Sequence, residues 1–255
     1  MPFTPAHAAA ALPFRRSFLP TAAIVIGTMS PDFEYFLRLA PRGHFGHTAV
    51  GVLVMDLPLS LLVLWLYGRD LRPTFIALFF DSAGHPESKA WDVPGVTAAC
   101  AGILVGAATH ILWDSFTHRS FWPYQHMAVL HKPIFLLGTA RIELYEVLQQ
   151  LSSLVGLLVV GVWCWRLLKT DTRHRGVKII SGHRKDLAAC AAFIGISSVM
   201  RASGGATTAP EPLRIAVFVG DLVVTTMSLT FLAILSFSVI YVNRQIPPRP
   251  PQTIS

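Results

Sequence analysis

The segment THILWDSFTH, at positions 109–118, holds the polar residues of this chain whose spacing is most specific. His110, Asp114 and His118 are four residues apart, so a helix places all three on one face. Imidazole nitrogens and carboxylate oxygens are common ligands of zinc, manganese and iron, and donors four apart can reach one ion. Eight residues of helix span about 12 Å, which is long for three ligands of one metal. We therefore expect His118 to serve a second metal or a phosphate.

Three further segments carry residues of the same chemical types: TPAHAAAALP with His7, SPDFEYF with Asp32 and Glu34, and HFGHT with His44 and His47. Thr4 before Pro5 is typical of a helix N-terminus with Thr4 as its cap, and Pro31 after Ser30 predicts a second short helix. A lone histidine is more often a packed polar residue than a ligand. These segments indicate a shared site only if the fold brings them together.

The composition shows what kind of fold has to position these residues. Apolar residues make up 53% of the 255 residues and charged residues 14%, whereas a soluble domain carries about 25% charged residues. The mean hydropathy is +0.52. These values argue against a disordered chain, a nucleic-acid-binding tail protein and an ordinary soluble enzyme, and they predict membrane helices. The net charge is +7. In a membrane protein, the basic residues in the loops determine the orientation of the spans, so we expect no nucleic acid as partner.

Five apolar runs are long enough to cross a bilayer, which takes ~20 residues of helix: 49–67, 95–113, 147–168, 187–203 and 213–242. We therefore predict an all-α fold, a polytopic integral membrane helical bundle of about five transmembrane helices with short N-terminal helices. The run TFIALFF at 74–80 is too short to cross and is predicted to be interfacial or re-entrant. Three cysteines lie far apart without a C-x-x-C pair, which supports neither a disulfide framework nor a zinc knuckle.

The motifs and the charge divide the chain into three parts. Residues 1–120 form a motif-bearing region with two spans, and residues 121–243 hold the remaining helices with a basic loop at 169–186. Residues 244–255 form a Pro-rich tail. Because the dense Lys and Arg residues of the 169–186 loop favour the cytoplasmic side, we expect a cytoplasmic C-terminus and an external N-terminus.

Topology brings the four motifs to one side of the membrane. If the spans 49–67 and 95–113 are antiparallel, the start of the first and the end of the second share a side. His47 precedes the first span, and His110 and Asp114 end the second. The alternative is a polar helix end wetted by headgroups, but charged groups in a bilayer cost ~2.5–3.5 kcal/mol, which favours a site. Residues 1–46 lie on the same side, which puts His7 and Asp32 within reach of these donors. Together with the family resemblance described next, this predicts one pocket formed by five residues: His7, Asp32, His47, His110 and Asp114.

The motifs also carry a family resemblance. Their order is MPFTPAHAAAALP, GTMSPDFEYF, FGHTAVG with MDLP, and HILWDSFTH. It resembles a bacterial membrane-protein family catalogued as domain of unknown function 4184, closely over residues 1–120. That pattern is similar to a group of membrane-bound metal-dependent hydrolases and, more distantly, to zinc-dependent phospholipase C. The resemblance implies five metal ligands, namely His7, Asp32, His47, His110 and Asp114. This chain departs from the group at Glu34, where a second Asp or His is frequent.

The function that follows is a membrane-embedded metal-dependent hydrolase for phosphoesters of a lipid or lipid-linked substrate. The cofactor is a divalent metal, with zinc favoured over manganese or iron. Asp32 or Glu34 is the candidate general base, and His118 the candidate acid. The resemblance to a bacterial membrane-protein family implies a bacterial inner (plasma) membrane, among membrane lipids. The distribution of Lys and Arg places the site on the extracytoplasmic side. The oligomeric state is left open.

Two other functions compete with the enzyme. A transporter would use the intramembrane residues Asp56 and Asp221, although we find no internal repeat and no paired broken helices. A non-catalytic membrane protein would hold a structural metal. If these two residues have only structural roles, Asp56 forms hydrogen bonds with backbone groups freed by Pro58, and Asp221 pairs with Arg214 or with a neighbouring helix. Four residues of the connection after the second span are expected to form an interfacial aromatic belt: Trp122, Tyr124, His126 and His131.

Overall fold

The structure, a computed structural model, describes residues 3–79, 93–137, 140–169 and 184–245. The chain divides into two compact units. The first comprises Met1–Glu34, Arg42–Leu64 and Lys89–Thr170, and the second comprises Tyr35–Pro41, Trp65–Ser88 and Asp171–Ser255. All of the metal ligands predicted from the sequence belong to the first unit.

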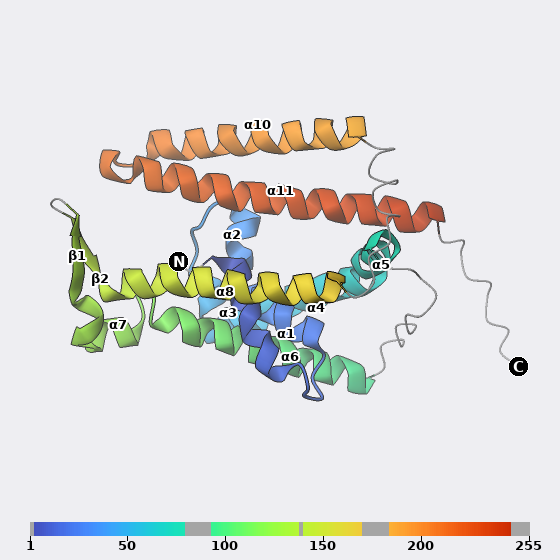
Figure 1. The fold of residues 1–255 in the computed structure, drawn as a ribbon, viewed down its shortest axis with the longest axis horizontal. Coiled ribbons are helices and arrows are strands. Elements are labelled where there is room, and N and C mark those ends of the chain that lie inside the picture. Colours follow the sequence, from blue (N-terminus) through green and yellow to red (C-terminus); the bar gives the residue numbers. More distant parts are fainter. Residues whose placement is uncertain (1–2, 80–92, 138–139, 170–183, 246–255) are drawn as a thin grey trace, which may run out of the picture. The chain divides into compact units, whose positions relative to one another are not determined.

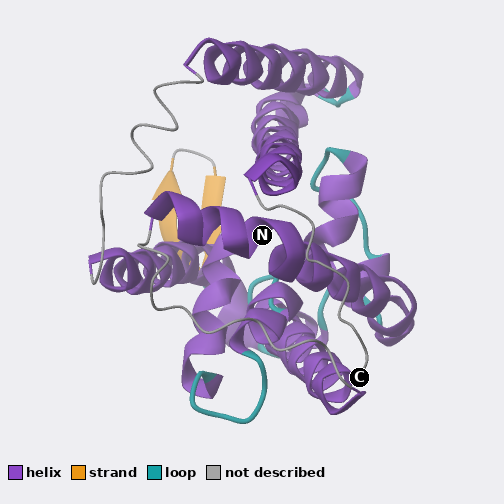
Figure 2. Ribbon diagram, turned by 90° about the vertical axis from the view of Figure 1, so that its right-hand side faces the viewer, coloured by secondary structure: helices purple, strands orange, loops and turns teal. Residues whose placement is uncertain are grey.

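The first unit is built from helices and one small hairpin, which Figure 2 draws in purple and orange. Its N-terminal part contains the 3₁₀ helix η1 (Thr4–Phe14), α1 (Thr21–Gly27), and the 3₁₀ turns η2 (Ser30–Asp32) and η3 (Phe45–His47). The next helix starts as α3 (Ala49–Gly51), η4 (Val52–Asp56) and α4 (Leu57–Leu66). The rest consists of α6 (Val93–Ser115), α7 (Trp122–His126), η7 (Ala128–His131), β1 (Pro133–Leu137), β2 (Ala140–Glu143) and α8 (Leu144–Lys169).

The second unit consists of helices among its described residues: most of α2 (Phe33–Arg38), η5 (Tyr67–Leu71), α5 (Arg72–Phe79), α10 (Arg184–Thr208), η8 (Glu211–Leu213) and α11 (Arg214–Gln245). The helices α10 and α11 pack side by side (Figure 1). Arg201 of α10 donates to Asp221 of α11 over 2.9 Å. The expected partner of Asp221 on a neighbouring helix is therefore Arg201, while Arg214 pairs with Glu211 at 3.3 Å.

Five helices are long and apolar enough to cross a membrane: Ala49–Ile76, Gly95–Ser115, Leu144–Arg166, Arg184–Thr208 and Glu211–Ile240. Their outward faces carry large apolar side chains, among them Leu154 at 57% exposed and Ile196 at 62%. Such faces suit contact with lipid tails rather than water. The prediction of a nearly all-helical, five-span integral membrane protein is confirmed.

The expectation that 74–80 is re-entrant is wrong, whereas an interfacial position of this segment stays a prediction. The described residues of that segment, up to Phe79, continue the helix that begins at Ala49. The charged residues around Asp70, which suggested an end to the span, lie inside the π-helical stretch η5. A helix retains its backbone hydrogen bonds through such a stretch, so local charge does not by itself end it.

The N-terminal helix η1 lies against α8. The amide of Phe3 donates to Ser153 Oγ over 3.0 Å, and a Cβ on Gly156 would come within 2.7 Å of the carbonyl oxygen of Ala6. Close backbone packing at a glycine is common between membrane helices. The predicted cap at Thr4 is wrong, because the N-cap position is Phe3 and makes no side-chain cap bond. The hydroxyl of Thr4 bonds elsewhere, as described below.

The antiparallel hairpin of β1 and β2 was not predicted from the sequence. Its strands pair from Pro133 opposite Glu143 to Leu137 opposite Ala140. The exposed Ile134 and Phe135 contribute β-branched and aromatic character, which favours strands. Most of the predicted basic loop (169–186) and of the Pro-rich tail (244–255) lies outside the described residues.

Candidate metal centre

One stripe of residues along α6 contains both the glycines that pack against α1 and two of the candidate metal ligands. Gly102, Gly106, His110 and Asp114 recur every four residues, so they share one face. A Cβ on Gly106 would come within 2.6 Å of the amide nitrogen of Thr28, at the end of α1. The glycines therefore let α6 lie against the backbone of α1, and the next two positions of the stripe point into the space beyond it. This repeat of small residues was a signal that the sequence analysis missed.

The ring of His110 is held in one orientation by the end of α1. Its Nδ1 lies 2.8 Å from the carbonyl oxygen of Thr28. Because a carbonyl only accepts, Nδ1 carries the proton, and Nε2 is left with a free lone pair. Metal-binding histidines are commonly oriented by such a bond. His110 is fully buried.

Four donor atoms surround a common space in this unit. Asp114 Oδ2 lies 3.3 Å from His110 Nε2 and 3.6 Å from His47 Nε2. Asp32 Oδ1 lies 3.7 Å from each of the same two nitrogens. Four donors at ~2.0–2.2 Å from a tetrahedral ion are about 3.3–3.6 Å apart. The nitrogen-to-oxygen separations are near this spacing. Donor atoms of Asp32, His47 and His110 lie within 4.8 Å of one another, as do those of His7, His110 and Asp114. We call Asp32, His47, His110 and Asp114 the quartet, whose donors could hold a metal ion.

The buried donor atoms of this cluster lack ordinary partners. Among the described residues, no hydrogen bond reaches His110 Nε2, Asp32 Oδ1, or either carboxylate oxygen of Asp114. The three residues are at most 1% exposed. A buried polar group without a partner costs roughly 1–3 kcal/mol, and more if it is charged. A bound cation would satisfy all of these atoms at once.

The other oxygen of Asp32 is held by the N-terminal helix. Thr4 Oγ1 donates to Asp32 Oδ2 over 2.5 Å, which leaves Oδ1 directed at His47 and His110. Asp32 ends the turn η2, whose first residue, Ser30, donates to the carbonyl of Gly27. Burial raises the pKa of Asp32 above its ordinary value. An adjacent cation would favour the ionised form and oppose that shift.

His47 is positioned by the short turn η3, which leads directly into the first span. Thr48 is the N-cap of this helix: its hydroxyl accepts from the amide of Gly51 over 2.9 Å and donates to the carbonyl of Phe45 over 2.7 Å. A Cβ on Gly46 would come within 2.5 Å of the carbonyl oxygen of Pro31. This glycine therefore allows η3 to approach η2, so that His47 reaches Asp32.

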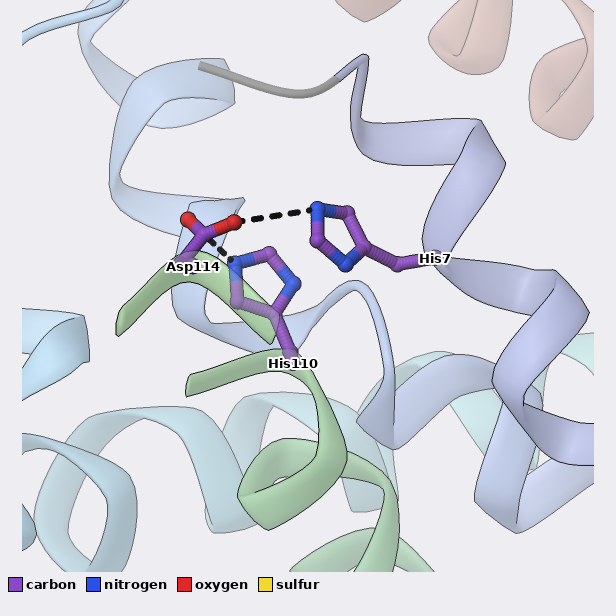
Figure 3. A group of neighbouring side chains, drawn as sticks. All are labelled: His7, His110 and Asp114. Atoms are coloured by element: carbon purple, nitrogen blue, oxygen red, sulfur yellow. Dashed lines mark ion pairs between the residues drawn. The ribbon is translucent and has the colours of Figure 1, made fainter. Parts of the chain in front are cut away.

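His7 joins the cluster from η1, opposite α6. Its Nε2 lies 3.4 Å from Asp114 Oδ1, and its ring stacks on His110 with centroids 3.9 Å apart (Figure 3). His7 is 1% exposed, and burial lowers its pKa to about 3, with His110 the next cause. The imidazole is therefore neutral at pH 7, which is the form that binds metals.

Glu34 and His118 lie differently from the five predicted ligands. Glu34 Oε2 accepts from the amide of Phe45 over 2.9 Å, so this carboxylate holds the turn before His47. His118 Nδ1 lies 3.2 Å from the Asp114 carbonyl oxygen and 3.6 Å from Asp114 Oδ2. With its side chain 20% exposed, His118 connects the buried cluster to the outside. Burial lowers its pKa, and a neutral ring at pH 7 suits a proton acceptor better than the expected acid.

The expectation for Asp56 is wrong. It was predicted to bond backbone groups freed by Pro58, but neither of its carboxylate oxygens has a hydrogen-bond partner among the described residues. The residue is fully buried and ends the π-helical stretch η4. Its charge interacts with His110 and Asp32.

The predicted aromatic belt forms a packed surface cluster. The rings of Trp122 and His126 stack at 4.6 Å, and those of Tyr124 and His131 lie 4.0 Å apart. Tyr124 also donates to Glu143 over 2.7 Å, which ties the region to β2. Trp122 is 66% exposed. An amphipathic surface of this kind suits a membrane interface.

Fold and site together define an integral membrane protein with a buried histidine and aspartate cluster inside a helical unit. The chain belongs to the family described as Domain of unknown function (DUF4184), which it matches over residues 1–239. No curated protein and no solved structure matches it. The family match thus extends well beyond residue 120.

Proposed function

We propose that this protein is a membrane-embedded metal-dependent hydrolase that acts on phosphoesters of lipids or lipid-linked substrates. The observation that carries the proposal is the quartet of Asp32, His47, His110 and Asp114, in which each imidazole nitrogen lies 3.3–3.7 Å from an oxygen of both carboxylates. Two imidazoles and two carboxylates suit zinc first, and manganese or iron as alternatives.

The protein's own residues would bind the metal and handle protons. When bound, a divalent metal supplies Lewis-acid polarisation of a phosphoryl oxygen and activates water near neutral pH. The bond from His110 to Thr28 and the bond from Thr4 to Asp32 orient two of the ligands. His118 contacts Asp114 and is partly exposed, so it is placed to exchange protons with water. Glu34 acts in this scheme by holding the turn that carries His47.

The position of the ligands supports a substrate at the membrane surface. His47 lies two residues before the first span, and Asp114 lies one residue before the end of the second. The cluster therefore belongs to the ends of two spans, at the level of lipid headgroups. A substrate with an apolar tail would approach past Trp122 and Tyr124. We further propose a bacterial inner membrane as its location. The distribution of basic residues favours a site on the extracytoplasmic side.

One observation favours a second candidate function, a non-catalytic protein with a structural metal. The quartet supplies four protein donors, and its side chains are at most 9% exposed. A closed four-ligand shell is typical of structural zinc, whereas catalytic zinc keeps one position for water. If the metal is catalytic, its loss should remove only turnover. If the metal is structural, its loss should also unfold the protein.

The test uses purified protein in lipid nanodiscs, with a panel of lipid phosphoesters as substrates. We expect phosphate release that a chelator abolishes and that added zinc or manganese restores. His110→Ala and Asp114→Ala should lose metal and turnover. His44→Ala is the matched control, because His44 is exposed and three residues from His47. Full metal binding without turnover on any substrate would support the structural role. Transport that depends on Asp56 and is indifferent to His110 would support a transporter.

A further inference from the structure

The two carboxylate oxygens of Asp114 face different histidines. Oδ2 belongs to the quartet, 3.3 Å from His110 Nε2 and 3.6 Å from His47 Nε2. Oδ1 lies 3.4 Å from His7 Nε2. Donor atoms of His7, His110 and Asp114 also lie within 4.8 Å of one another, without Asp32 or His47. Figure 3 shows His7 reaching this carboxylate from the N-terminal segment, while His110 approaches it from the preceding turn of α6.

The stacking of His7 on His110 separates their lone pairs. The two ring centroids are 3.9 Å apart, and the planes are inclined by only 26°. The lone pair of an imidazole nitrogen lies in the plane of its ring, so an ion in the plane of one ring lies well outside the plane of the other. One ion shared by both nitrogens would lie out of the plane of at least one ring, which favours a separate ion for each ring. Two ions, one for each ring, would be separated by about the 3.5–4 Å found in two-metal sites.

His7 also needs a ligand of its own. Both of its ring nitrogens are buried and have no hydrogen-bond partner among the described residues. The side chain is held in place, by the stack with His110 and by an edge contact with Trp113 at 5.1 Å between ring centroids. A buried imidazole with two unsatisfied nitrogens destabilises the fold unless a ligand binds it.

We propose that His7 Nε2 and Asp114 Oδ1 hold a second divalent cation, so that Asp114 bridges two metal ions. This inference rests on the metal binding proposed above and does not require hydrolysis. With two close protein donors instead of four, the second position is the weaker one and remains open to other oxygen ligands. Its donor set fits zinc or manganese completed by water or by the oxygens of a phosphate group. It thereby gives the centre the open position that the quartet lacks.

The test counts metal ions. Protein freed of metal is titrated with Mn²⁺, and bound metal is measured by elemental analysis alongside the electron paramagnetic resonance spectrum. We expect two equivalents in the wild type and an exchange-coupled spectrum, because a carboxylate bridges the ions. His7→Asn should bind one equivalent and give the spectrum of isolated Mn²⁺. His126→Ala, an exposed histidine outside the cluster, should bind two. Inorganic phosphate should tighten only the second equivalent.

The outcomes separate this inference from the proposed function. One equivalent in the wild type, or two in His7→Asn, would overturn the second site and leave the quartet standing. No bound metal in the wild type would overturn both. If His7→Asn does not fold, the wild-type spectrum still decides, because two uncoupled ions or a single ion contradict a bridge at Asp114.

Discussion

The hydroxyl of Thr4 donates to Asp32 Oδ2 over 2.5 Å. Thr4→Val keeps the shape of the side chain and removes the donor, so Asp32 loses the bond that directs Oδ1 at the histidines. Loss of such a supporting bond typically weakens metal affinity ~10–100-fold. We expect a loss in this range, measured by competition with a chromogenic chelator.

The control is another buried threonine. Thr74 donates to the carbonyl of Asp70 within its own helix, and it belongs to the second unit, whereas the cluster belongs to the first. Thr74→Val should leave the metal affinity unchanged. Equal losses in both variants would mean that buried threonines affect affinity through general stability, and that the bond from Thr4 to Asp32 has no specific role.

Asp56 provides a test of the competing functions at the residue scale. It is fully buried, and its carboxylate has no hydrogen-bond partner among the described residues. Asp56→Asn removes a buried charge, which is costly to retain. We expect a higher midpoint of thermal unfolding, an unchanged number of bound metals, and turnover within about tenfold of the wild type. Fewer bound metals would make Asp56 part of the centre.

At the scale of elements, the position of His110 depends on the contact between α1 and α6. A Cβ on Gly106 would come within 2.6 Å of Thr28 N, and Thr28 also holds the ring of His110. Gly106→Ala should therefore destabilise the protein by ~1–3 kcal/mol through overpacking. It should also weaken metal binding, because α6 moves relative to Thr28. Thermal unfolding and metal titration measure the two effects.

Gly161 of α8 is the matched control, since no atom lies within 4 Å of a Cβ built there. Gly161→Ala should be neutral, or stabilising by up to ~1 kcal/mol through helix propensity. If Gly106→Ala is equally harmless, the close approach of α1 and α6 does not constrain the cluster.

The elements also show which parts of the site could be predicted. The spacing of His110 and Asp114 indicates a shared helical face, and the order of the spans brings His47 to the same end. Placing His7 and Asp32 beside them depended on the family resemblance, because short helices outside the spans have no periodic signal that fixes their packing. The hydroxyl of Thr4 was assigned to a cap, since its partner 28 residues away cannot be read from local sequence.

Departures from regular helix geometry explain the remaining errors. The π-helical stretches η4 and η5 lie inside the first long helix and contain the buried Asp56 and Asp70. Local charge and Pro58 suggested kinks and ends there, but the helix continues. The hairpin of β1 and β2 was missed because its strands are short and lie within a segment dominated by aromatic and basic residues.

At the scale of the whole molecule, five membrane crossings would put the residues before the first span and those after the last on opposite sides. We expect the cluster on the external side. Once Cys100, Cys164 and Cys190 are replaced by serine, His44→Cys should react with a membrane-impermeant maleimide in intact cells. Arg184→Cys, at the start of α10, should react only after lysis. The reverse pattern would move the site to the cytoplasmic side without affecting the proposed metal ligands.

The central claim, that histidine and aspartate donors bind a metal, is tested most directly by X-ray absorption at the zinc edge on purified, zinc-loaded protein. We predict that zinc is bound stoichiometrically and tightly. Its nearest neighbours should be nitrogen and oxygen atoms at ~2.0–2.2 Å, and the imidazole rings should give outer-shell scattering. The signal should be lost in Asp114→Asn and retained in His44→Ala. Sulfur scattering at ~2.3 Å would assign the metal to cysteine. That result, or zinc retained by Asp114→Asn with an unchanged spectrum, would contradict the account.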